Sequence, residues 1–198
     1  MLRPRCSVFI AMSVDGYIAR PDGSLDWLDS VQRPGEDHGF RRFMDSVDTL
    51  VLGRRTYETA LGFGAWPYAG KRCVVLTHAP PPARHGEEFF SGAPLSLVER
   101  LAAQGARRVY VDGGAVIRAF LEAGMIDDLT LSIIPVLLGD GIPLFGRSPI
   151  EQRLLSIGSR RYESGLVQLE YRREREVDEV INGVLNENGK KDLDGSNA

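Results

Sequence analysis

Short apolar runs and helical patterns alternate along most of the chain. The apolar runs, which are typical of buried strands, lie at residues 6–11, 49–52, 73–77, 109–111 and 128–136. Between them, apolar residues recur at helical spacing at residues 37–45, 56–60, 96–103 and 115–123. Alternation of this kind predicts a mostly parallel sheet covered by helices on both faces. Ser96 and Glu99 have the spacing of a capping box, which predicts that the third helix begins there.

The last part of the apolar pattern differs from the rest. Residues 152–163 and 166–172 flank Ser164-Gly165 and have the features of a β-hairpin. The sequence therefore predicts an α/β domain whose doubly wound, mostly parallel sheet closes with an antiparallel C-terminal hairpin.

A change in composition marks the end of this domain. Residues 1–175 contain no Asn and one Lys, Lys71, whereas residues 176–198 contain four Asn, two Lys and no Arg. We therefore place the domain at residues 1–175. The compositionally foreign tail, 176–198, is expected to be disordered or marginally helical.

Composition and charge exclude several classes of protein. With 43% hydrophobic residues and a net charge of −3 over 198 residues, the chain is predicted to be neither disordered nor a general nucleic-acid binder. No apolar run approaches the roughly 20 residues of a membrane span, so we expect no membrane partner. Cys6 and Cys73 lack the spacing of a metal or redox motif, which predicts buried thiols in a cytoplasmic protein and no metal site.

Two strands are followed directly by glycine and then by a helix start. The run 109–111 leads into Gly113-Gly114 and a helix, and the run 49–52 leads into Gly53. Glycine lets the backbone approach a phosphate, and the free N–H groups of a helix start point at it. A tight turn without any ligand explains one Gly-Gly pair equally well. Two such junctions in one chain indicate a single ligand with several phosphates.

The second junction also carries positive charge. Arg54 and Arg55 follow Gly53, and Thr56 supplies a hydroxyl at the helix start. Guanidinium groups bind phosphate through paired donors. Two cations beside the positive end of a helix are unfavourable without an anion, which favours phosphate binding over a solvated helix start.

Five motifs, in order, resemble the dihydrofolate reductase superfamily. Within it the chain is most similar to stand-alone relatives of the reductase domain of the bifunctional riboflavin-biosynthesis deaminase/reductase. The resemblance runs from Cys6 to Arg172, and its motifs lie at residues 10–19, 23–27, 53–58, 111–114 and 135–145.

The resemblance implies an NADPH-dependent reductase of the dihydrofolate or 5-amino-6-(5-phosphoribosylamino)uracil reductase type. Such an enzyme passes a hydride to a C=N or C=O group of a pterin-like or pyrimidine-like heterocycle. By the resemblance, the family's nicotinamide positions fall on Ala11 and Ile18. Its positions at the adenosine end fall on Leu76, Thr77 and His78. Its positions at the phosphates fall on Gly53, Arg54, Arg55, Thr56, Gly113, Gly114 and Ala115.

The resemblance also indicates residues for the substrate. Asp37 lies 16 positions before Gly53, the spacing of the acid that anchors and protonates substrate in folate reductases, with Glu36 beside it. An acid is also favoured at a helix start by the dipole alone. If Asp37 lies in an apolar pocket, its pKa should rise. Ser132 replaces a family threonine that bonds the acid and the substrate ring. Trp27 either stacks on a flat heterocycle or holds its loop on the core.

Departures from the folate pattern leave the substrate open. Lys71 stands where folate reductases hold the substrate's glutamate tail with an arginine, so the paired donors are lost. Residues 135–145 follow the riboflavin-type pattern, in which this region helps to form a homodimer. The zinc-type His/Cys set of the deaminase is absent from the sequence. Alternatives are a dihydrofolate reductase with a weakened tail site and a non-catalytic dimeric nucleotide-binding protein.

Overall fold

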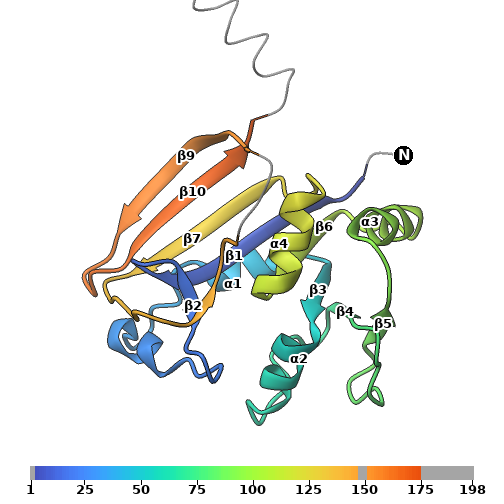
Figure 1. Ribbon diagram of the computed structural model, residues 1–198, viewed down its shortest axis with the longest axis horizontal. Coiled ribbons are helices and arrows are strands. Elements are labelled where there is room, and N and C mark those ends of the chain that lie inside the picture. The colour runs from blue at the N-terminus through green and yellow to red at the C-terminus, as the bar shows by residue number, and fades with distance from the viewer. Residues whose placement is uncertain (1–2, 147–150, 175–198) are drawn as a thin grey trace, which may run out of the picture.

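The computed structural model describes residues 3–146 and 151–174, which form one large sheet with helices on both faces (Figure 1). The strand order is β5-β4-β3-β6-β1-β7-β10-β9. The first six strands in this order are parallel, β10 is antiparallel to β7, and β9 is antiparallel to β10. The predicted doubly wound sheet and its closing hairpin are therefore confirmed. The strands are β1 (Arg5–Ser13), β3 (Thr49–Gly53), β4 (Arg72–Leu76), β5 (Glu88–Phe90), β6 (Arg108–Asp112), β7 (Asp128–Ile134), β9 (Leu154–Arg161) and β10 (Val167–Arg173).

Alternate residues of the central strands bury opposite faces. Val51, Val109 and Val111 pack in one core cluster with the helices α3 (Pro94–Ala103) and α4 (Gly114–Glu122). Leu50 and Leu52 pack in another with α1 (Phe40–Asp45) and α2 (Arg54–Leu61). Because both faces are covered, the strands are apolar throughout instead of alternating with polar residues. A separate pair, β2 (Tyr17–Ala19) and β8 (Ile142–Pro143), and the 3-10 helix η1 (Asp26–Val31) complete the fold.

The predicted capping box is wrong. Helix α3 begins at Pro94 after Ala93, and no side chain caps it. Proline at the first helical position has a preset φ and lacks the N–H that would otherwise need an acceptor, so it starts the helix ahead of Ser96. Helix α1 likewise begins at Phe40, later than the predicted residue 37.

Several short elements were not predicted. These are β2, β5, β8 and η1, none longer than six residues. The predicted boundary at residue 175 and the tail 176–198 lie outside the described residues. Within the described ranges, no helix combines the length and apolar character needed to span a membrane.

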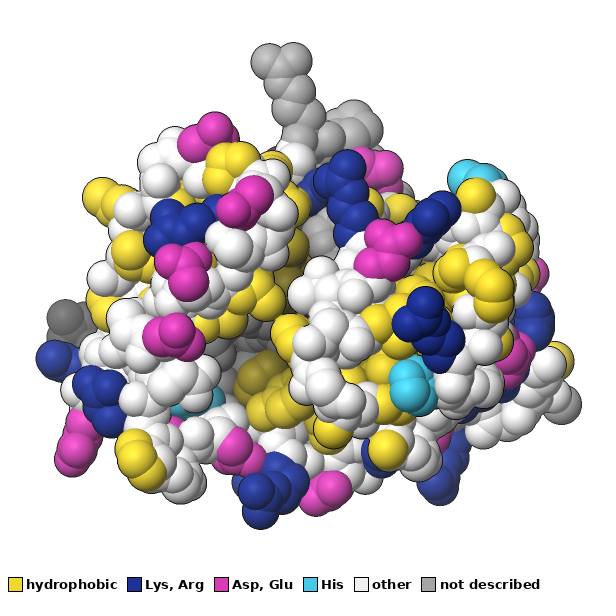
Figure 2. Space-filling view, turned by 90° about the horizontal axis from the view of Figure 1, so that it is seen from below, with side chains coloured by type: hydrophobic (Ala, Val, Ile, Leu, Met, Phe, Trp, Pro, Cys, Tyr) yellow, Lys and Arg dark blue, Asp and Glu magenta, His cyan; other side chains and the backbone are white. Residues whose placement is uncertain are grey.

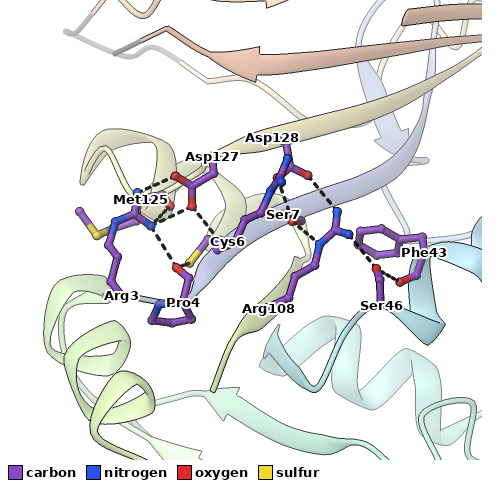
Figure 3. A network of polar contacts seen from close by, with 11 residues as sticks. Arg3, Pro4, Cys6, Ser7, Phe43, Ser46, Arg108, Met125, Asp127 and Asp128 are labelled. Carbon is purple, nitrogen blue, oxygen red and sulfur yellow. Dashed lines mark hydrogen bonds and ion pairs between the residues drawn. The ribbon is translucent and has the colours of Figure 1, made fainter. Parts of the chain in front are cut away.

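A network of ion pairs ties three strands together at their amino-terminal ends (Figure 3). The buried Asp127 accepts hydrogen bonds from Arg3 and from the backbone N–H of Cys6, at 2.7 and 2.8 Å. The buried Asp128 accepts from Ser7 and Arg108, at 3.1 and 3.2 Å. Side-chain bonds between strands fix their relative position, and the network leaves the opposite, carboxyl-terminal edge of the sheet for the site.

Both cysteines are free and buried, as predicted. Burial raises the pKa of each thiol to about 12, and for Cys6 the neighbouring Asp127 adds to this effect. Because the thiolate is the reactive form, neither cysteine is a nucleophile at neutral pH.

Candidate functional site

The two glycine junctions lie side by side at the carboxyl ends of neighbouring strands. Strands β3 and β6 pair in parallel with Leu52 opposite Asp112, so Gly53 and Gly113 follow at the same level. Gly113 has a φ of +93°, and a Cβ there would lie 2.3 Å from the Thr56 hydroxyl oxygen. Only glycine accommodates both the backbone angle and this close approach. Residues 60 positions apart in the chain therefore form one cradle.

The starts of α2 and α4 both face this cradle. The N-cap residues Gly53 and Gly113 have no side chain that could cap these helices, so within the described residues the first N–H groups of each remain available as donors. Such groups, together with the positive end of the helix dipole, favour a bound anion. The structure thus brings together the predicted phosphate residues, from Gly53 to Thr56 and from Gly113 to Ala115.

The two predicted arginines have different surroundings. Arg54 bonds Glu58 at 2.8 Å and the backbone oxygen of Ala79 at 3.1 Å. Arg55 is exposed, and its guanidinium has no hydrogen-bond or ion-pair partner within residues 3–146 and 151–174. Arg55 is therefore the cation that can turn to a phosphate without breaking an existing contact.

A third arginine, which the sequence analysis did not single out, lies at the other junction. Arg118 donates to the backbone oxygen of Pro143 at 2.5 Å, and a Cβ on Gly114 would lie 3.0 Å from its guanidinium. The same Cβ would lie 3.0 Å from the methyl carbon of Ile18. Ile18 thus covers the start of α4, and Ala115 is exposed on its first turn.

The predicted adenosine segment lies at the same edge of the sheet. Leu76, the last residue of β4, pairs with Gly53 in register. Thr77 accepts a bond from the backbone N–H of residue 79 at 3.1 Å, which shapes the turn. The His78 ring is exposed and its Nδ1 lies 2.6 Å from the Ser91 hydroxyl. The second ring nitrogen is therefore the one left to face a ligand.

On the other side of β1, three paired residues form a row across the sheet. Ala11 of β1 pairs with Ser132 of β7, which pairs with Gln168 of β10. Ser132 and Gln168 are both buried polar side chains. The Gln168 amide nitrogen lies 3.1 Å from the Ser132 hydroxyl and 3.0 Å from the His38 backbone oxygen. Ser132, expected to bond Asp37, bonds Gln168 instead.

Trp27 and His38 enclose the same region. Trp27 is 5% exposed and lies in a core cluster with Ala11 and Tyr162, so in this structure it holds η1 on the core. The His38 and Tyr162 rings are 4.8 Å apart. Neither the Trp27 indole nitrogen nor the His38 Nε2 has a hydrogen-bond partner among the described residues, although both atoms are buried. Buried polar atoms without partners are uncommon and indicate a place where a ligand is recognised.

Asp37 is not in an apolar pocket, so the condition for a raised pKa is not met. Its side chain is exposed, and its two oxygens accept hydrogen bonds from the backbone N–H groups of Gly39 and Arg41, each at 3.0 Å. These bonds lower the pKa of Asp37. The carboxylate stabilises the turn that leads into α1, which is the structural role expected of an acid at a helix start. Glu36 beside it is half-buried.

A different acid, Asp112, lies next to the cradle. Burial raises the pKa of this half-buried carboxyl to about 6, against the opposing effect of the Gly113 N–H, the Tyr110 hydroxyl and the Tyr68 hydroxyl. The Tyr110 hydroxyl beside it donates to the backbone oxygen of Phe9 at 2.9 Å. In the sequence, the feature that could have indicated Asp112 is its position between a buried strand and Gly113-Gly114.

Seen from the side on which α2 lies, the molecule has a central hollow (Figure 2). Hydrophobic side chains line the bottom of the hollow, and charged side chains of both signs surround it. Because α2 follows β3 directly, this is the side at which the carboxyl ends of the parallel strands emerge. Open α/β sheets bind ligands at this edge. The described residues contain no group of three or more His, Cys, Asp or Glu side chains that could hold a metal ion.

Comparison with known proteins assigns the chain to a family. The sequence model of the RibD C-terminal domain matches residues 4–168. The chain belongs to the RibD C-terminal domain family. The uncharacterized protein YwjB of Bacillus subtilis is 36% identical over 167 residues, which cover 83% of this chain and 95% of YwjB.

Solved structures agree with this assignment. A protein of Shewanella sp. PV-4 assigned to riboflavin biosynthesis is 38% identical, with a TM-score of 0.82 over 86% of this chain and 99% of that one. Dihydrofolate reductase of Enterococcus faecalis, complexed with NADP(H), has a TM-score of 0.60 at 19% identity over 88% of this chain and all of that one. At that identity the likeness shows the fold, and the dihydrofolate-reductase-like fold is confirmed.

Proposed function

We propose that this member of the RibD C-terminal domain family is an NADPH-dependent reductase. It transfers a hydride to a C=N or C=O group of a pterin-like or pyrimidine-like heterocycle. The observation that carries the proposal is the meeting of the two glycine junctions, where Gly113 has no room for a side chain beside Thr56. Family membership and the NADP(H) complex of the Enterococcus neighbour support it.

The residues present fit a dinucleotide cofactor. The two helix starts offer free N–H groups to its phosphates, and Arg55 adds a positive charge that has no ion-pair partner in the described part of the chain. Side chains at Gly53 and Gly113 would fill the cradle, because a Cβ at Gly53 would come within 3.1 Å of Val116. When bound, NADPH supplies the hydride. Ala11 and Ile18 are proposed to lie against its nicotinamide, and Leu76, Thr77 and His78 against its adenosine.

The chain's own residues would handle the proton that accompanies the hydride. Asp112 lies beside the cradle and holds a proton more readily than an exposed carboxyl does, since its pKa is raised to about 6. A general acid works best when its pKa is near the working pH. We therefore propose Asp112, in place of Asp37, as the proton carrier, with Ser132 and Trp27 at the substrate.

The alternative of a dihydrofolate reductase has less support. Lys71, the substitute for the tail-binding arginine, donates to the backbone oxygen of Val47 at 2.8 Å. Its ammonium is already engaged within the fold. We also propose a cytoplasmic homodimer built through residues 135–145, on which Leu137 and Phe145 are 71% and 45% exposed. A non-catalytic binding protein would bind NADPH without turnover.

The proposal is tested by titrating the full chain with NADPH and with NADH, following the fluorescence of Trp27 and Trp66. We expect binding at micromolar NADPH and clearly weaker binding of NADH. Absence of binding by either dinucleotide would contradict the proposal and leave the junctions a purely structural role.

Arg55→Ala is expected to weaken NADPH binding by about 10- to 150-fold, since a hydrogen bond to a charged group contributes roughly 1.5–3 kcal/mol. Arg54→Ala should have a smaller effect, because Glu58 and Ala79 already occupy that guanidinium. The same titration measures both, with Arg161→Ala on the distant strand β9 as the control. Unchanged affinity in Arg55→Ala would remove this residue from the site.

Asp37→Ala is expected to change kcat by less than about tenfold and to destabilise the protein by about 1 kcal/mol, the typical cost of losing a helix-start acceptor. Steady-state NADPH oxidation and urea unfolding measure the two effects. A fall in kcat of about 10²–10⁴, the usual loss for a general acid, would instead restore Asp37 as the proton carrier.

A further inference from the structure

The row formed by Ala11, Ser132 and Gln168 runs from the cofactor side of the site toward the C-terminal hairpin. Residues paired in register on neighbouring strands point to the same face of a sheet and lie close enough to interact. The proposed function places Ala11 at the nicotinamide, so Ser132 is the next side chain outward. A substrate ring that receives a hydride must therefore lie near Ser132.

The orientation of the Gln168 side chain is fixed by its neighbours. One end of the amide lies 3.0 Å from the His38 backbone oxygen, which can only accept a hydrogen bond. That end must be the NH₂ group, and the other end is then the oxygen, which accepts from the Tyr162 hydroxyl at 3.3 Å. The second amide hydrogen points to Ser132, at 3.1 Å.

This arrangement determines what Ser132 can offer to a ligand. Its oxygen accepts a hydrogen from Gln168, so its own hydroxyl hydrogen is directed elsewhere, and no acceptor for it occurs among the described residues. The Trp27 indole N–H, a donor only, is also buried without an acceptor in the described part of the chain. The site therefore presents two neutral donors that lack partners.

We propose that Gln168 is a positioning residue that holds Ser132 as a hydrogen-bond donor, so that the site selects a ring carbonyl over a ring amino group. The proposal rests on the proposed function for the placement of the ring beside Ala11. A carbonyl oxygen would accept from Ser132, and the Trp27 indole N–H, in the same core cluster as Ala11, is a second donor for it. A ring amino group would bring its own hydrogens against these donors, leaving buried hydrogens unpaired, which is costly.

The surroundings of the row agree with this selectivity. A site for a protonated amino-substituted ring needs a carboxylate at the ring, and Asp37 does not supply it, because both its oxygens accept from backbone N–H groups on an exposed turn. His38, whose buried Nε2 has no partner among the described residues, can donate or accept according to its tautomer and so does not oppose a carbonyl.

The test compares two pteridines of the same shape and opposite polarity, 2,4-dioxopteridine and 2,4-diaminopteridine. Calorimetric titration of the full chain is expected to give at least about tenfold tighter binding of the dioxo compound. Equal affinities, or tighter binding of the diamino compound, would overturn the proposal. The titrations are run without and with NADPH, so that a failure of cofactor binding, which would refute the proposed function, remains separate.

Gln168→Glu is the decisive variant, because it keeps the shape of the side chain and replaces its donor end by an acceptor. The Ser132 hydroxyl would then donate to the carboxylate and present a lone pair to the ring. We expect the preference for the dioxo compound to shrink at least about tenfold or to reverse. A uniform loss of affinity for both compounds would indicate a merely structural role and contradict the proposal.

Ser132→Ala keeps the proposal testable if Gln168→Glu does not fold. It removes the donor without adding a charge, and we expect the dioxo preference to fall while NADPH affinity stays unchanged. Ser159→Ala, at an exposed position of β9, is the matched control and should bind both pteridines like the unaltered chain. A full preference retained in Ser132→Ala would exclude Ser132 as the selective donor.

Discussion

Gly113→Ala is expected to abolish NADPH binding at concentrations that saturate the unaltered chain and to lower the free energy of unfolding. A side chain at a φ of +93° costs about 1–3 kcal/mol by itself. The added Cβ would also lie 2.3 Å from the Thr56 oxygen, so Thr56 or the helix start that carries it must move. The cradle for the phosphates would be lost with that movement. Urea unfolding and the dinucleotide titration measure the two effects.

A matched variant separates the two causes. Gly105 has a similar φ of +82°, with nothing within 4 Å of an added Cβ, so Gly105→Ala introduces only the backbone strain. We expect Gly113→Ala to be clearly more destabilising than Gly105→Ala. Adding Thr56→Ala to Gly113→Ala should recover most of the difference in stability. Equal losses of unfolding free energy in the two glycine variants would show that the close approach to Thr56 does not contribute to the destabilisation.

Asp112→Asn is expected to stabilise the folded chain at neutral pH. Burial raises the pKa of Asp112 from its ordinary 3.8 to about 6, so the folded state favours the protonated carboxyl. A raised folded-state pKa contributes stability that is fully present below pH 4 and is lost as pH rises through 6. At about 1.4 kcal/mol for each pKa unit, the loss approaches 3 kcal/mol. Asparagine resembles the neutral acid and has no such loss.

Urea unfolding at pH 4 and pH 7 measures this difference. The stability gained by Asp112→Asn should grow by about 2–3 kcal/mol between these values and stay constant above pH 7. The unaltered chain, unfolded at the same two pH values, is the reference. A gain that is independent of pH would mean that Asp112 ionises in the folded chain as readily as in the unfolded one.

The same variant is expected to lose catalytic activity. If Asp112 carries the proton, kcat should fall by about 10²–10⁴, and the remaining rate should no longer change with an apparent pKa near 6. Together with Asp37→Ala, this variant identifies the functional acid. Activity close to that of the unaltered chain, with the same pH profile, would exclude Asp112 from proton transfer.

The sequence was sufficient to predict the two glycine junctions that we propose as the phosphate side of the site. Glycine after a buried strand and before a helix is a local signal, and the structure brings the junctions at Gly53 and Gly113 together because β3 and β6 are neighbours. The individual roles within the junctions were not visible in the pattern. Only the contacts of Arg54 with Glu58 and Ala79 distinguish it from Arg55.

The contacts on the proposed substrate side were less visible in the sequence, for a physical reason. The spacing of Asp37 indicated an acid near the ring, but spacing does not report that the carboxylate turns back to its own backbone N–H groups. Gln168 gave no signal, because its partners His38 and Ser132 lie 130 and 36 residues away in sequence. The sequence pattern around a polar residue in a strand is the same whether or not the residue has such hydrogen-bond partners.

By itself, the sequence determined the order of the longer strands and helices, the buried faces and the glycine junctions, because apolar periodicity and backbone freedom are local properties of the chain. The tertiary structure alone decided which residues of distant strands share a level of the sheet, which acid is desolvated, and which hydroxyl accepts from the Gln168 amide. Those outcomes depend on burial and on hydrogen-bond partners, and both are set by packing between segments that lie far apart along the chain.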